Sequence, residues 1–130
     1  MSLLEAIHQR WAASAALNDL LPASRVYTGI GAELVMPYAV ITRLSDRPSA
    51  YHNDGSTVTT VGVRIDVLHD NYDSAEAIVS QILAAFNRSD FALSSADKVI
   101  NMQQSNNFHR QEDNDTWRMV IDFDCTVYIA

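Results

Sequence analysis

The sequence predicts an α+β domain in which two helices pack on one face of a mostly antiparallel four-stranded sheet. Two segments have the apolar spacing of amphipathic helices, and others alternate apolar and polar residues as half-buried strands do. The expected order is helix, strand, strand, helix, strand, strand, so each pair of strands can close as a hairpin. With 130 residues, we expect one domain, 1–130, long enough to bury a core.

The first helix is predicted from its cap and its apolar spacing. Leu3, Ile7 and Trp11 recur at helical intervals after Ser2, and Glu5 stands three residues beyond that serine, as in a capping box. An alanine-rich run extends the helix over residues 12–21, and the proline at position 22 ends it.

The glycine pair Gly29 and Gly31 raises the question of a phosphate-binding loop. Such a loop needs a helix N-terminus directly after the glycines, because the backbone amides and the helix dipole bind the anion together. Here the chain leads instead into a predicted strand over residues 38–44. We therefore interpret the glycines as a connector.

The sheet is predicted from alternation, most regularly in residues 117–129 and 57–69. In the latter segment Val63 and Ile65 face one way, whereas Arg64 and Asp66 face the other. A weaker strand is expected over residues 99–104. Between these strands lies the second helix, with Asp73 as the expected cap, Glu76 completing a capping box, and an end near Asn87. Its apolar stripe of Ile78, Ile82 and Phe86 is expected to pack against Val63, Ile65, Ile121 and Phe123.

Two polar segments, 45–56 and 105–115, are predicted as long mobile loops, because both lack a period and the first contains Asn53-Asp54-Gly55. Long polar loops often carry binding residues. The expected partner-facing residues are Arg47, Tyr51, His52, Asp54, Phe108, Arg110 and Glu112.

The charge balance argues against tight nucleic-acid binding. The chain has a formal net charge of −7 with sixteen acids against nine bases, and Lys98 is the only lysine. A duplex binder needs clustered cations that displace counterions from the phosphates. No stretch reaches the ~18 apolar residues of a membrane span. Cys125 is the only cysteine, so we expect no disulfide within the chain and a reducing compartment.

No catalytic set is evident, and no cofactor motif is recognised. The four histidines lie far apart, and Cys125 belongs to the apolar side of its strand, where an inert thiol is expected. Asp122 and Asp124 share one strand face about 7 Å apart, and Asp66 can join them. Together these acids could hold a divalent cation, but a solvated polar sheet face is the favoured interpretation.

The layout of almost the whole chain resembles the tail completion proteins of tailed bacteriophages, also called tail terminator or head–tail joining proteins. The resemblance is carried by the opening helix "LLEAIHQRWAASAALNDLL", the passage "RVYTGI…MPYAVI" and the strand "TVGVRIDVLHD". The helix "DSAEAIVSQILAAF" and the closing strand "WRMVIDFDCTVYIA" complete it. In that family the second passage leads from the first helix into the first strand.

This resemblance implies a structural role without catalytic residues or cofactors. Members form a ring, expected here as a hexamer, at the head-proximal end of the tail, where the ring stops tube growth and meets the head connector. The implied partners are further copies, the tail tube protein and the connector, in a virion tail assembled in the bacterial cytoplasm. DNA would pass through without specific binding, and no membrane is involved.

Acids lining a ring would repel DNA phosphates, so Asp66, Asp122 and Asp124 are the expected channel-facing residues. The alternative is a small α+β ligand-binding or metal-dependent enzyme that uses the same acidic face.

Overall fold

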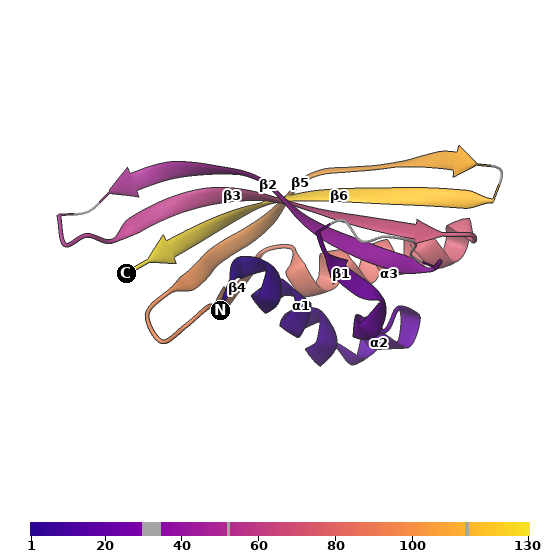
Figure 1. The fold of residues 1–130 in the computed structure, drawn as a ribbon, viewed down its shortest axis with the longest axis horizontal. Helices are drawn as coiled ribbons and strands as arrows, with labels where there is room; N and C mark the ends of the chain where they lie inside the picture. Colours follow the sequence, from indigo (N-terminus) through magenta and orange to yellow (C-terminus); the bar gives the residue numbers. More distant parts are fainter. Residues whose placement is uncertain (30–34, 52, 114) are drawn as a thin grey trace.

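The computed structural model describes residues 1–29, 35–51, 53–113 and 115–130. Within these residues the chain forms a twisted six-stranded sheet with three α-helices on one of its faces (Figure 1). The helices are α1 (Leu3–Ala13), α2 (Ala15–Leu20) and α3 (Tyr72–Phe86), and a 3-10 turn follows α2 at Ala23–Arg25. The strands are β1 (Val26–Thr28), β2 (Tyr38–Tyr51), β3 (Thr57–His69), β4 (Ser89–Ala92), β5 (Lys98–Asp113) and β6 (Thr116–Ile129).

The predicted four-stranded sheet with two helices is wrong. The strand order is β1-β2-β3-β6-β5-β4, and the sheet is mixed because β1 pairs with β2 in parallel while the other pairs are antiparallel. The two additional strands are β1 and β4, three and four residues long. Segments this short show no alternation that a sequence pattern could reveal, and only pairing with their neighbours makes them strands.

The first predicted helix is two helices, because the chain breaks at Ser14. This serine ends α1, and its side chain accepts a hydrogen bond from the Leu17 backbone at 3.3 Å to begin α2. The Asn18 amide then donates to the carbonyl oxygens of Trp11, Ala12 and Ser14 at 2.8–3.0 Å. These side-chain bonds take up carbonyl groups that a continuous helix would pair internally. The capping box of Ser2 and Glu5 is confirmed.

The two predicted long loops are wrong as well, because both segments are mostly strand. β2 runs to Tyr51 and β5 to Asp113, each interrupted by bulges, with one bulge in β2 between Arg43 and Ser45. Over residues 43–47 and 105–112 the side chains on both sheet faces are exposed, so no apolar alternation is required there. Their backbones nonetheless pair along nearly the full lengths of β3 and β6.

The core lies between α3, α1 and the helix-side face of the sheet. Ile78, Ile82 and Phe86 belong to the same buried cluster as Val63, Ile65, Ile121 and Phe123, so the predicted strand faces are confirmed. The rings of Phe86 and Phe123 meet edge to face, with centroids 6.4 Å apart.

The ends of α3 differ in detail from the prediction. The cap is Asn71, whose side chain accepts from the Ser74 backbone at 2.9 Å, and Asp73 lies inside the helix. The helix does end at Asn87, but the left-handed residue is the following Arg88, with φ 62°. In the described part of the chain, no helix is both long and apolar enough to cross a membrane.

Candidate partner-binding surface

The residues predicted to face partners lie on two hairpins that project from opposite ends of the sheet (Figure 1). Arg47 and Tyr51 belong to β2, and Asp54 lies in the turn before β3, where its carboxylate accepts from the Ser56 backbone at 3.0 Å. His52 lies outside the described residues. The second hairpin, β5–β6, carries the other three predicted residues, Phe108, Arg110 and Glu112. The expected set is therefore divided between two separate surfaces.

The sheet face turned away from the helices, here called the open face, carries paired charges. Arg64 on β3 lies directly across from Asp122 on β6. The guanidinium donates from Nε and Nη2 to the two carboxylate oxygens at 2.7 and 3.0 Å, which is the bidentate geometry that binds an arginine and a carboxylate most firmly. Hydrogen bonding to Asp122 raises the pKa of Arg64 above its ordinary value.

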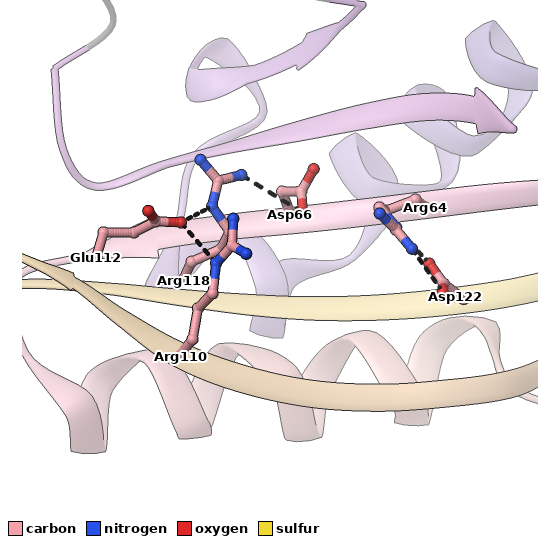
Figure 2. Close-up of polar contacts among 6 residues, drawn as sticks. All are labelled: Arg64, Asp66, Arg110, Glu112, Arg118 and Asp122. Carbon is pink, nitrogen blue, oxygen red and sulfur yellow. Dashed lines mark hydrogen bonds and ion pairs between the residues drawn. The ribbon is translucent and has the colours of Figure 1, made fainter.

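A second charge network connects the tip of the β5–β6 hairpin with β3 (Figure 2). Glu112 accepts hydrogen bonds from both Arg110 and Arg118, and Arg118 also lies 3.6 Å from the Asp66 carboxylate. Figure 2 shows the Arg118 guanidinium between the two carboxylates. Arg118 thus connects Glu112 near the hairpin tip with Asp66 on the central strand β3.

The two carboxylates that share Arg118 are shifted in opposite directions. Hydrogen bonds from Arg118 and Arg110 lower the pKa of Glu112 below its ordinary value. Burial raises the pKa of Asp66, and the nearby guanidinium groups of Arg118 and Arg64 offset only part of that effect. The side chain of Asp66 is only 16% exposed, so it has lost much of the hydration that favours its charged form.

Long side chains also shield the apolar part of the open face. Val120 is 2% exposed although it points away from the helices, and Phe108 lies directly across from it on β5. The Arg64 guanidinium stands 5.9 Å from the centroid of the Phe108 ring, within cation–π range. The Phe108 ring and the Arg64 side chain therefore lie over the open face near Val120.

The three acids expected to line a channel do share the open face, but they are not equivalent. Asp66 and Asp122 are both paired with arginines, and the three arginines of these networks balance Asp66, Glu112 and Asp122. Asp124 is exposed and lies across from Gly62. The sequence showed these arginines only as scattered cations. The alternation of apolar and polar residues could have indicated the pairing, because it places residues 64 and 66 of one strand and residues 118, 122 and 124 of the other on the same sheet face.

An aromatic cluster anchors the β5–β6 hairpin to α3, and sequence patterns did not reveal it. The ring of Tyr72, at the start of α3, meets Trp117 at 4.9 Å and His109 at 5.4 Å between centroids, both edge to face. These residues come from three elements, so no local spacing connects them. Because the cluster lies on the helix side of the hairpin, it complements the Arg118 network on the open face.

Two of the groups considered for catalysis, His8 and Cys125, are held within the fold. His8 lies 3.0 Å from the carbonyl oxygen of Ala23 and 3.1 Å from that of Val26, which fixes the turn before β1. Cys125 is fully buried, and burial raises the pKa of its thiol to about 12. In the described ranges, no three His, Cys, Asp or Glu side chains are grouped to hold a metal ion.

The profile of the family described as tail completion protein gp17 matches residues 5–128, nearly the full length of the sequence. The chain belongs to this tail completion family. Its fold is similar to that of a chain in the solved structure "Virion of native gene transfer agent (GTA) particle". The TM-score is 0.77 at 18% sequence identity, with 98% of this chain and 96% of that chain covered. No curated protein sequence matches at a significant level.

Membership confirms the resemblance drawn from the sequence. Tail completion proteins are structural components of the bacteriophage virion tail, so this chain is a structural protein of that kind. The structural match covers almost all of both chains, so the two folds are similar over nearly their full lengths.

Proposed function

We propose that residues 1–130 act as one tail completion domain that caps the tail tube and joins the tail to the head as an oligomeric ring, a hexamer in the simplest case. Family membership over residues 5–128 carries this proposal. The fold shared with a chain of a gene transfer agent virion supports it, since that chain occurs within an assembled particle.

The two projecting hairpins suit a protein that contacts two different structures. Arg47 and Asp54 belong to the β2–β3 hairpin, whereas Arg110 and Glu112 belong to the β5–β6 hairpin at the other end (Figure 1). A joint between the tube protein and the head connector needs two such surfaces. We assign the predicted partner contacts to these two hairpins. We also propose that the tail assembles in the bacterial cytoplasm.

In such a ring, Asp66, Asp122 and Asp124 are the candidate channel-facing acids. Two of them are neutralised by arginines, so Asp124 supplies most of the repulsion that keeps passing DNA from binding. The same pairing weakens the enzyme alternative, because the carboxylates needed as metal ligands already bind Arg64 and Arg118.

Electron microscopy of particles made with and without the chain tests the proposal. Without it, we expect unjoined heads and tails with uncontrolled tube length, and adding the protein back should restore complete virions. Complete virions in its absence would refute the proposed role. Asp124→Lys should fold and assemble but slow DNA passage, because a cation in the channel binds phosphates. Asp19→Lys makes the same charge change on exposed α2 and should have no effect.

A further inference from the structure

Two stretches of sheet edge have no neighbouring strand among the residues that the structure describes. β1 pairs with β2 only as far as Ile41, and β4 pairs with β5 only as far as Met102. Beyond those points both strands continue, paired on one side alone. We call residues 42–47 the β2 edge and residues 106–110 the β5 edge. Unpaired edges of this length are templates for another strand.

The two edges lie on opposite sides of the sheet and are offset from each other along the strands. Through β3, the β2 edge lies level with residues 122–126 of β6, whereas the β5 edge pairs with residues 118–122. β2 and β5 run antiparallel to each other, because β3 and β6 alternate direction between them. A second copy placed alongside with a shift along the strands therefore brings its β2 edge to the β5 edge of the first copy. The resulting pair is antiparallel. In this arrangement β1 and β4 lie just beyond the two ends of the paired stretch.

The β5 edge has the features of a strand that accepts a partner. Its register with β6 is regular over residues 106–110, between bulges at either end, and it contains neither lysine nor proline. Edges that must avoid pairing usually carry such residues. The Asn107 backbone N–H donates to the Asn106 side chain at 2.9 Å, so it points away from β6. In the isolated subunit the Asn106 side chain thus accepts the hydrogen bond that a carbonyl oxygen of a neighbouring strand could accept instead.

Each edge carries one large apolar side chain that is partly exposed. Leu44 on the β2 edge is 47% exposed and Phe108 on the β5 edge is 38% exposed. Pairing of the two edges would bury part of both side chains.

We infer that the ring is joined by strand pairing, with the β5 edge of each copy pairing with the β2 edge of the next. This inference rests on the proposed ring. A closed ring of more than two copies needs a heterologous interface, that is, two different patches that fit each other. The two free edges supply such patches, and the partner is a second copy of this chain.

Single-edge variants of the full chain test the joint. Asn107→Pro removes an N–H that β6 does not use, and Leu44→Lys places a charge on the β2 edge. Asn107→Lys serves as a second β5 variant if proline disturbs the fold, and Ser80→Lys on exposed α3 is the matched control. Circular dichroism verifies folding, and sedimentation of each protein at up to millimolar concentration measures assembly.

We expect the wild type and Ser80→Lys to form the ring, and each edge variant to remain a monomer of 14.4 kDa. An equimolar mixture of Asn107→Pro and Leu44→Lys should give a one-to-one dimer, because one intact β5 edge and one intact β2 edge remain. Rings that persist in both folded variants would overturn the inference and leave the proposed function standing. Dimers of Leu44→Lys alone would show β5 pairing with itself and overturn it too. A wild type that stays monomeric throughout would also count against it, whereas the virion experiment judges the proposed function separately.

Discussion

Truncation of Phe123 to alanine tests the packing of α3 on the sheet. The side chain is 1% exposed and contacts the ring of Phe86, which is 0% exposed, at a centroid separation of 6.4 Å and an interplanar angle of 64°. Removal of a fully buried phenylalanine side chain costs about 3–5 kcal/mol, which includes the cavity it leaves. The edge-to-face ring pair accounts for about 0.5–1.5 kcal/mol of that loss. We therefore expect the free energy of unfolding to fall by about 3–5 kcal/mol.

Urea denaturation followed by circular dichroism measures this difference, with the midpoint shifted and the slope unchanged. Phe123→Leu keeps a large apolar side chain but loses the ring pair, so its cost should be clearly smaller. Ile129→Ala on the same strand is the exposed control, at 39% exposure, and should cost less than about 1 kcal/mol. A loss below about 1 kcal/mol for Phe123→Ala would refute the assigned core.

Four further outcomes are expected. Trp11→Phe removes the buried hydrogen bond from the indole to the Leu21 carbonyl oxygen, 2.9 Å long, and should cost about 1–3 kcal/mol in the same assay. Glu112→Gln should be less stable than the wild type at neutral pH. That gap should close as the pH falls through the lowered pKa of Glu112, because the wild type then loses its charged form too. Asp66→Asn should gain stability relative to the wild type as the pH rises through the raised pKa of Asp66, since only the wild type must then ionise a buried acid. For either variant, a difference in unfolding free energy from the wild type that does not change with pH would contradict the assigned environment. Cys125, with its pKa raised to about 12, should resist thiol reagents at pH 8 until the protein unfolds, and rapid labelling of the folded protein would show that it is accessible.

The packing of α3 on β3 and β6 was predictable because the residues involved follow a local period. β3 begins and ends where its alternation does, and the apolar stripe of α3 lies on the sheet. The cap of α1 was equally predictable, because Ser2 and Glu5 form a contact within one helical turn. In all three cases the determining interactions lie within the segment or follow its periodicity.

What was missed depends on contacts between distant segments. Residues 105–113 have no apolar period, yet they form a strand because β6 offers its backbone on one side. The pairing of Arg64 with Asp122 joins positions 58 residues apart, so each appeared alone in the sequence. The break at Ser14 is a local feature, but it depends on Asn18 side-chain bonds that compete with a helix favoured by the surrounding alanines.

The positions of the two chain ends decide where an affinity tag can be placed. Met1 and Ile129 line the same pocket, and both termini lie toward the end of the molecule that carries the β2–β3 hairpin (Figure 1). The backbone of Ala130 also donates to Asp97 at 2.9 Å, which holds the C-terminus there. A fusion at either end would therefore crowd the β2–β3 hairpin and leave the β5–β6 hairpin accessible. Tagged protein should thus be used to study contacts of the second hairpin, whereas contacts of the first require the tag to be cleaved.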